Sequence, residues 1–250
     1  MTEQNTQQEV AVKPTTAVGS VAARGRGFDD DVDQGDFLIP RAKVVTFTSN
    51  ETKDPDETKR IPAGRFINSV SKLEIPKEFV PIMRYKNYVR FNPIDTRDPN
   101  FDKNFEPGKL IFSTRDRHDQ RVVEGIVWGE NGEKPVVQKV LNYLCYFKGE
   151  NFPLILSFKS TSYKGAQRLN TLLESAGGDM FSNRYKLIIT QESKAGNAYY
   201  VLNVEAAGKT GPEDLAICED IYNRFGGKDL EGMAHQEEAI VTPEDTNTGW

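Results

Sequence analysis

Short apolar runs separated by Gly, Pro, Asn and Asp recur through most of the chain, from about Phe37 to about Lys228. Most runs alternate apolar and polar residues or are dense in β-branched and aromatic side chains, which is typical of strands. The pattern predicts strands at Phe37–Thr48, Gly64–Val70, Phe79–Phe91, Lys109–Thr114, Arg121–Trp128, Val136–Lys148, Leu154–Lys159, Arg184–Gln191 and Ala198–Ala206. Such a chain has to pack many short strands together.

Two segments have the composition of tight turns between these strands. Asn131-Gly132 has the residues of a two-residue turn, because both tolerate positive φ. Ser193–Asn197 resembles the tip of a hairpin. Both turns favour antiparallel neighbours.

Two segments have helical periodicity. Apolar residues recur at spacings of three and four over Tyr163–Ala176 and over Pro212–Phe225, and a glycine pair follows each segment. Thr210 and Glu213 have the spacing of a capping box, and the proline suits a first helical turn. Strands and helices do not alternate regularly, which argues against a parallel α/β sheet. We therefore predict a mainly β protein, an antiparallel barrel or sandwich with two peripheral helices.

The charges divide the chain into three parts. Residues 1–36 carry −4 and residues 229–250 carry −6, so the net charge of −5 leaves +5 for the central part. Residues 1–36 have almost no large apolar side chains, so they cannot bury enough surface to offset the entropy of ordering, and from Asp229 onward the chain is again polar and uncapped. The prediction is a disordered arm at 1–36, a basic β-rich domain at 37–228, and a disordered acidic tail at 229–250.

Several functional classes lack their characteristic residues. Cys145, Cys218, His118 and His235 are too few for a disulfide framework or a four-ligand zinc site. The chain has no phosphate-binding loop of the Walker type and no Gly-x-Ser-x-Gly motif. No signal peptide or stretch of 18 apolar residues occurs. We expect a cytoplasmic binding protein without catalytic residues, metal or cofactor.

The segment Phe79–Phe91 is the most informative about function. A regular strand presents Phe79, Met83, Tyr85, Val89 and Phe91 on one face and Arg84, Lys86, Tyr88 and Arg90 on the other. Cations that neutralise phosphates, interleaved with a ring that stacks on an unpaired base, favour single-stranded nucleic acid. A solvated strand whose cations pair with neighbouring acids would have the same pattern.

Further basic and aromatic residues extend this candidate interface. In the segment Val136–Lys148 alternate residues share a face, and the pattern does not decide which face is buried. The candidate nucleic-acid-binding residues are Arg84, Lys86, Tyr88, Arg90, Tyr146, Lys148, Lys159, Tyr163, Lys164, Arg168, Lys186 and Tyr199. Each aromatic residue taken singly could also belong to the core.

The tail ends in an aromatic residue with the α-carboxylate. A tethered polyanion competes with DNA for a cationic groove, and once released its terminal ring can dock on another replication protein. The candidate partner-binding residues are Glu237, Glu238, Glu244, Asp245 and Trp250. A merely solubilising tail is the alternative.

The basic β-rich body, acidic C-terminus and terminal aromatic residue together resemble the single-stranded-DNA-binding proteins of bacteriophage replication. That resemblance implies an OB-like barrel, here with extra strands, and a tail that recruits polymerase or helicase. The segment from Phe37 to Lys228, about three quarters of the chain, also resembles another phage protein family. The segments that carry this second resemblance are Ile39-Pro40-Arg41, Ser157–Lys164 and Tyr199-Tyr200-Val201.

These observations predict sequence-independent binding of single-stranded DNA in phage replication or recombination, in the host cytoplasm and with a homo-oligomer as one option. A mediator that anneals strands would share this chemistry. The alternative from another class is a phage structural or assembly protein without a nucleic-acid role.

Overall fold

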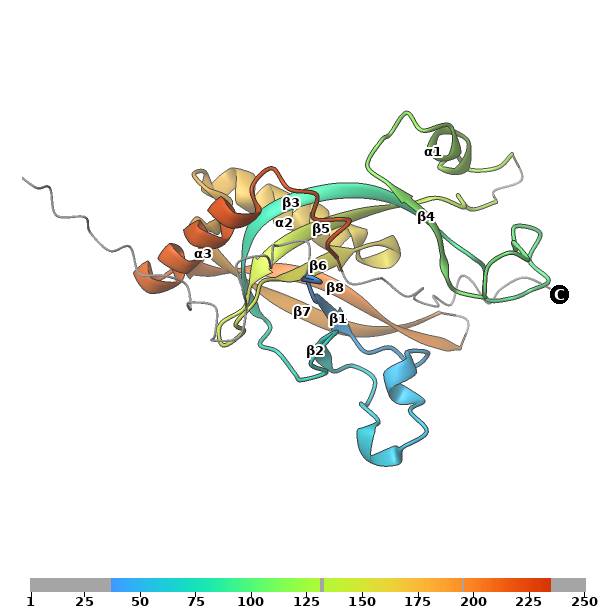
Figure 1. Ribbon diagram of the computed structural model, residues 1–250, viewed down its shortest axis with the longest axis horizontal. Coiled ribbons are helices and arrows are strands. Elements are labelled where there is room, and N and C mark those ends of the chain that lie inside the picture. Colours follow the sequence, from blue (N-terminus) through green and yellow to red (C-terminus); the bar gives the residue numbers. More distant parts are fainter. Residues whose placement is uncertain (1–36, 131–132, 195, 235–250) are drawn as a thin grey trace, which may run out of the picture. The chain divides into compact units, whose positions relative to one another are not determined.

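The computed structural model describes residues 37–130, 133–194 and 196–234. Within these ranges one mixed sheet of eight strands carries three helices (Figure 1). The strands are β1 Arg41–Val44, β2 Phe66–Asn68, β3 Glu78–Phe91, β4 Leu110–Thr114, β5 Gln138–Tyr146, β6 Leu154–Phe158, β7 Asn183–Lys194 and β8 Asn197–Lys209. The helices are α1 Gln120–Gly125, α2 Tyr163–Ala176 and α3 Pro212–Phe225.

The strand order is β2-β1-β6-β5-β3-β7-β8, and β4 pairs with β3. Strands β1 and β6 are parallel, whereas the other pairs are antiparallel. The sheet does not close into a barrel. The prediction of a mainly β fold is confirmed, but an antiparallel OB-like barrel is not.

Strand β5 runs through the middle of the core, and both of its faces are covered. On one face, Tyr143 packs with Phe158 of β6 and Leu169 of α2 in what we call the α2-side cluster. On the other face, Leu144 packs with Ile155 of β6 and with α3 in the α3-side cluster. Burial on both faces explains why the alternation in this segment did not reveal a single core face.

A β-bulge changes which side chains of β3 share a face. The register of β3 against β5 shifts between Pro81 and Met83. Phe79 therefore packs in the α2-side cluster, whereas Met83 and Tyr85 pack in the α3-side cluster. The prediction that these three residues share a face was wrong, because the extra residue of a bulge reverses the alternation beyond it.

Both long helices span the predicted residues. Helix α2 ends at Gly177, whose φ of 64° is the left-handed conformation that glycine adopts without strain. Helix α3 has Pro212 in its first turn, as expected, but its N-cap is Gly211 and makes no side-chain hydrogen bond. The predicted capping box is therefore not formed, and the buried Thr210 hydroxyl has no hydrogen-bond partner among the described residues.

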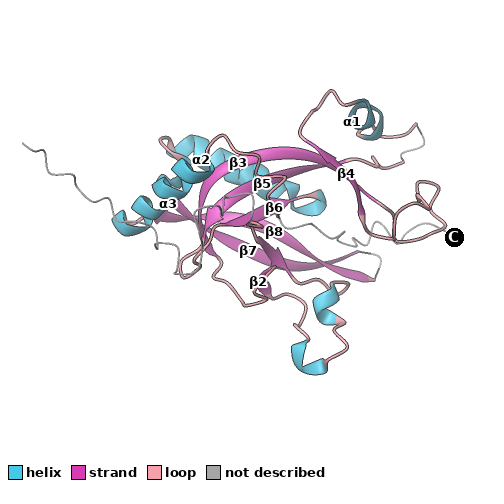
Figure 2. Ribbon diagram, in the orientation of Figure 1, coloured by secondary structure: helices cyan, strands magenta, loops and turns pink. Residues whose placement is uncertain are grey.

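One predicted strand is a helix. Residues 120–125 form α1 where a strand was expected, and the Asp119 carboxylate accepts a 3.0 Å hydrogen bond from the Arg121 backbone N–H at its start. Val122 and Ile126, one helical turn apart, pack in a small cluster with Tyr88. The cap and this spacing stabilise a short helix in a β-branched segment. Helices α1 and α3 lie at opposite ends of β3 (Figure 2).

The other boundaries agree with the predictions only in part. The predicted strand Phe37–Thr48 contains only the four residues of β1, and a loop follows them. The hairpin tip predicted at Ser193–Asn197 lies where β7 ends and β8 begins. The turn predicted at Asn131-Gly132 lies outside the described residues.

The folded part extends beyond the predicted boundary at Lys228. Leu230 and Ala234 are buried in the α3-side cluster. The Ile39 backbone N–H also donates a 2.7 Å hydrogen bond to the Met233 carbonyl. In the described part of the chain, no helix has the length and apolar composition needed to cross a membrane.

Candidate functional site: a basic cavity beside β1 and β6

A cavity of about 440 Å³ lies where β1 and β6 separate. The two strands are paired only at Arg41–Ile155 and Ala42–Leu156, and β1 then continues along β2. The cationic side chains that line the cavity are Arg41, Lys43, Lys53, Lys72, Lys109 and Lys159. Among the described residues, no Asp or Glu lines it. The cavity wall is therefore strongly positive.

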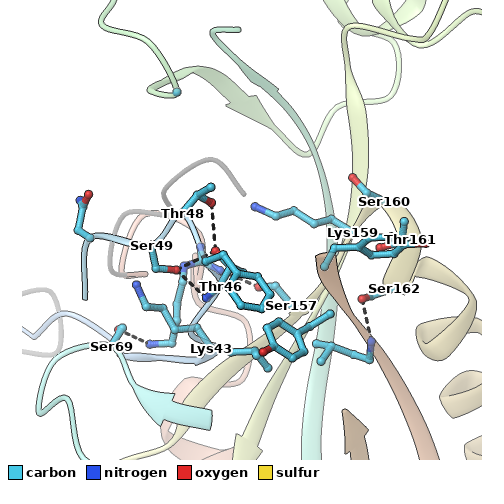
Figure 3. Close-up of a pocket in the computed structure, with 18 of the residues that line it drawn as sticks. Lys43, Thr46, Thr48, Ser49, Ser69, Ser157, Lys159, Ser160, Thr161 and Ser162 are labelled. Atoms are coloured by element: carbon cyan, nitrogen blue, oxygen red, sulfur yellow. Dashed lines mark hydrogen bonds between the residues drawn. The ribbon is translucent and has the colours of Figure 1, made fainter. Parts of the chain in front are cut away.

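Hydroxyl groups and aromatic rings complete the lining. The hydroxyls belong to Thr46, Thr48, Ser49, Ser69, Ser157, Ser160, Thr161 and Ser162, and the rings to Phe47, Tyr199 and Tyr200. Figure 3 shows Thr46, Thr48 and Ser49 on one side of the space and Ser160, Thr161 and Ser162 on the other. The cavity thus offers cations, neutral hydrogen-bond donors and flat apolar surfaces together.

The loop after β1 folds on its own hydroxyl groups. The Ser49 hydroxyl accepts a 2.9 Å hydrogen bond from the Thr46 backbone N–H and lies 2.9 Å from the Thr46 hydroxyl. The Thr52 hydroxyl then donates a 2.7 Å hydrogen bond to the Ser49 carbonyl. These local bonds offer the backbone an alternative to continuing β1 as a strand, so the chain turns at the cavity wall.

Glu51 holds two lysines of the cavity in place. Its carboxylate oxygen lies 2.7 Å from both the Lys43 and the Lys72 ammonium groups, and the residue is only 8% exposed. Burial alone would raise the pKa of this carboxyl group, but the hydrogen bonds from Lys43 and Lys72 outweigh that effect and lower the pKa to about 2. Glu51 is therefore ionised at neutral pH and offsets part of the charge of the two lysines.

Arg41 is oriented by a chain of buried and half-buried polar groups that crosses the sheet. The Arg41 guanidinium donates to the Ser157 hydroxyl (2.8 Å), which donates to the Asn142 side-chain oxygen (2.6 Å). The Asn142 amide donates to the Asn87 oxygen (2.8 Å), and the Asn87 amide donates to Glu231 (3.2 Å). Such a satisfied network fixes the rotamers of its members, so Arg41 is preorganised at the cavity.

A buried asparagine brings Lys109 to the cavity. Asn92 is 1% exposed, and its side-chain amide donates to the carbonyls of Asp102 (2.9 Å) and Phe105 (2.8 Å). Its side-chain oxygen accepts a 2.8 Å hydrogen bond from the Asp102 backbone N–H. These bonds close the long connection between β3 and β4, whose last residues before β4 line the cavity.

The junction between β6 and α2 forms the opposite wall. The Lys159 ammonium lies 4.5 Å from the centre of the Phe91 ring. Ser160 has a φ of 47°, an uncommon conformation for a residue with a side chain, and the structure around it must stabilise that turn. The Ser162 hydroxyl accepts a 3.0 Å hydrogen bond from the Leu202 backbone N–H, which joins the junction to β8.

The aromatic part of the cavity is centred on a stacked pair. The rings of Phe47 and Tyr200 lie 5.5 Å apart at an angle of 14°. Phe47 is 46% exposed, so part of its surface is open to a ligand. The neighbouring Tyr199 donates a 3.1 Å hydrogen bond from its hydroxyl to Glu192.

The structure does not bring the sequence-predicted site residues into one surface. Of those residues, Lys159 and Tyr199 line the basic cavity, and Lys86 and Tyr88 line a second cavity next to α1. Tyr88 is 2% exposed and Tyr146 is 9% exposed, and both belong to core clusters. Both rings are too deeply buried to stack on a base, which corrects the expectation that they do so.

The remaining candidates are distributed over the surface, and several have protein partners. Arg84 donates to Asn170, Lys148 lies 3.9 Å from Asp214, and Lys186 lies 3.7 Å from Glu205. Arg90 donates to the Asn100 carbonyl, Tyr163 is half-buried, and Lys164 and Arg168 are exposed on α2. The acidic and aromatic candidates Glu237, Glu238, Glu244, Asp245 and Trp250 lie outside the described residues.

Sequence reasoning missed most cationic residues of the cavity, although part of the signal was present. The segments 39–41, 157–164 and 199–201, which carry the resemblance to a phage family, all contribute residues to the cavity. Their convergence depends on the parallel pairing of β1 with β6, which local periodicity cannot reveal. Lys53 and Lys72 come from loops and had no periodic pattern to mark them, and Lys109, predicted as the first residue of a strand, lies just before β4.

The two cysteines and the groups of the cavity wall differ in their chemistry. Burial raises the pKa of Cys218 to about 12 and that of Cys145 well above its usual value, so neither thiol is an activated nucleophile. In residues 37–130, 133–194 and 196–234, no cluster of three His, Cys, Asp or Glu residues could hold a metal ion. Cations and hydroxyls contact phosphate oxygens well, and exposed rings stack on planar groups.

Comparison with known proteins gives one match. No curated protein and no solved structure shows significant similarity to the chain. The family described as Pam3 phage gp34-like protein matches residues 6–231, which covers almost the whole folded part and points to a bacteriophage origin. The chain therefore belongs to the Pam3 phage gp34-like protein family.

Proposed function

We propose that this protein binds single-stranded DNA without sequence preference, and that the basic cavity is its principal contact. The observation that supports the proposal is the composition of the cavity wall: six cationic residues, eight serine and threonine residues and three aromatic rings, with no Asp or Glu among the described residues. A polyanion with flat, unpaired bases matches each of these groups. The proposal places the protein in phage DNA replication or recombination.

The cations supply the affinity. Lys43 and Lys72 share the charge of Glu51, and Lys109 lies 3.9 Å from Glu106 in an exposed pair, so these lysines are partly compensated. The six positive charges of the cavity wall nevertheless outnumber the negative charges of Glu51 and Glu106, and this excess positive charge attracts phosphates. Phosphate binding releases counterions, and this makes the affinity fall steeply with salt.

The rings and hydroxyls determine the kind of nucleic acid. The partly exposed Phe47, supported from behind by Tyr200, offers a stacking surface for an unpaired base. A base in a duplex is already stacked on its neighbours, so duplex DNA gains less from this ring. Stacking does not depend on base identity, and the protein would therefore bind single strands of any sequence.

A fluorescence anisotropy titration with oligo-dT at several salt concentrations tests the proposal. The logarithm of the binding constant should fall with the logarithm of salt concentration, with a slope of about −0.7 for each phosphate contacted. Duplex DNA of the same length should bind more weakly. Absence of binding at low salt would refute the proposal.

Paired variants locate the binding surface. Lys53→Gln/Lys109→Gln removes two cavity cations, and Lys77→Gln/Lys103→Gln removes two exposed lysines outside the cavity. The first pair should reduce the salt slope by about 1.4, and the second should leave it nearly unchanged. Equal effects of the two pairs would show that only the overall charge matters.

The contribution of the Phe47 ring to binding is tested against a control substitution at another exposed ring. Phe47→Ala should lower the affinity for oligo-dT by about 5- to 150-fold, the equivalent of about 1–3 kcal/mol for one stacked base. Phe105→Ala removes a ring of similar exposure that does not line the cavity. If both substitutions have the same effect, stacking at Phe47 is not part of binding.

The role of the acidic C-terminal segment belongs to the same proposal. A chain that ends after Ala234 keeps the buried contacts of Leu230 and Ala234 and removes four of the six acids of the predicted tail. If the segment competes with DNA and recruits polymerase or helicase, its deletion should tighten binding to oligo-dT. Unchanged or weaker binding would contradict competition.

A further inference from the structure

A second cavity, of about 320 Å³, lies next to α1. Three cationic side chains line it: Lys86 from β3, Lys139 from β5, and Arg117 from the turn before α1. Its floor is apolar and includes Tyr88 and Val122. No Asp or Glu of the described ranges takes part in this lining.

The lysines of this cavity rest on aromatic rings. The Lys86 ammonium lies 5.7 Å from the centre of the Tyr88 ring, and the Lys139 ammonium lies 4.9 Å from that of Tyr163. Neither lysine lies within ion-pair distance of a carboxylate in the described part of the chain. A cation held on a ring keeps its full charge, so both remain available to an anion.

Side-chain contacts at the junction of β6 and α2 connect the linings of the two cavities. Ser160, which lines the basic cavity, lies with its hydroxyl 2.9 Å from the side-chain oxygen of Gln138. The next residue of β5 is Lys139, which lines the second cavity and contacts Tyr163 at the start of α2. Gln138 and Lys139, the first two residues of β5, therefore connect a residue of the basic cavity to the second cavity.

We propose that the second cavity is an additional phosphate-binding site, and that a single-stranded DNA long enough to pass the β6–α2 junction occupies both cavities at once. The inference rests on the proposed function and defines the path of the strand. The basic cavity holds one part of the strand and its stacked base. Lys86, Lys139 and Arg117 hold phosphates of the following part.

The experiment compares oligo-dT of about 4 and about 16 nucleotides, the range of site sizes of small single-strand-binding domains, in titrations against the full chain. The variant Lys86→Gln/Lys139→Gln should bind the short probe like the wild type, because that probe fits in the basic cavity. For the long probe its salt slope should be smaller by about 1.4. When the salt concentration rises from about 50 to about 200 mM, the variant should then lose affinity for the long probe by a factor about sevenfold smaller than the factor for the wild type.

Two further variants keep the test decisive. Lys86→Gln/Arg117→Gln leaves the contact between Lys139 and Tyr163 intact, so the same smaller slope in this variant shows that the effect does not come from loss of that contact. Lys77→Gln/Lys103→Gln is the charge-matched control outside both cavities. A wild-type slope for the long probe in both cavity variants would overturn the inference, while the proposed function would stand. If the wild type binds neither probe, the proposed function fails, and the inference fails with it.

Discussion

Replacement of Glu51 by Gln should destabilise the folded protein strongly at neutral pH and weakly in acid. The carboxyl pKa falls from 4.5 to about 2 when Glu51 is buried between Lys43 and Lys72. Because this pKa is lower in the folded chain, the ionised carboxylate stabilises the fold above about pH 4.5, and the contribution is lost as pH falls toward 2. A shift of this size corresponds to about 3 kcal/mol at pH 7, and to roughly half of that at pH 3.

Urea unfolding followed by circular dichroism at both pH values measures this difference. Glu74→Gln is the matched control, because Glu74 pairs with Arg65 at 2.8 Å but both side chains are more than half exposed. An exposed pair contributes less than about 1 kcal/mol. A Glu51→Gln variant that lost no more stability than Glu74→Gln at pH 7, or lost as much at pH 3 as at pH 7, would contradict this role of Glu51.

Three further predictions concern the scaffold of the site. A Cβ at Gly165 would lie 2.2 Å from the Leu202 carbonyl oxygen, so Gly165→Ala should destabilise the protein by about 1–3 kcal/mol. Thermal unfolding measures this loss, and Gln167→Ala, at an exposed position on the same helix, should not cause it. Asn92→Ala removes the hydrogen bonds that close the β3–β4 connection, so amide hydrogen exchange should accelerate over residues 93–109 but not over β5. Exchange over residues 93–109 at the wild-type rate would contradict this role of Asn92. Both thiols are fully buried, so a thiol reagent should not label the native protein at pH 8 and should label two cysteines in denaturant; rapid native labelling would be inconsistent with that burial.

Local patterns predicted the secondary structure well where one rule dominated. The spacing of apolar residues and the terminal glycines gave both long helices at their observed residues. The pattern misled at α1, where β-branched residues favoured a strand and the cap at Asp119 favoured a helix. It also misled at the bulge in β3, because one extra residue reverses the faces of every residue after it.

The site was less predictable than the fold, because it is assembled from distant segments. Lys159 and Tyr199 were identified by their basic and aromatic neighbours in the sequence, and both line the basic cavity. The burial of Tyr88 depends on α1 packing over it, and that helix was not expected. Lys43 and Lys72 come together only through Glu51, a contact that no sequence spacing reveals.

Photocrosslinking identifies the residues that contact DNA, and so measures whether single-stranded DNA lies in the basic cavity. The full chain is irradiated with a single-stranded oligonucleotide that contains 5-bromouracil, and the crosslinked peptides are identified by mass spectrometry. If DNA lies in the basic cavity, crosslinks form at Phe47 and at Tyr199 or Tyr200. These crosslinks are lost in the Phe47→Ala variant. Crosslinks confined to the exposed Trp128, or to other residues outside the cavity, would contradict binding in the basic cavity.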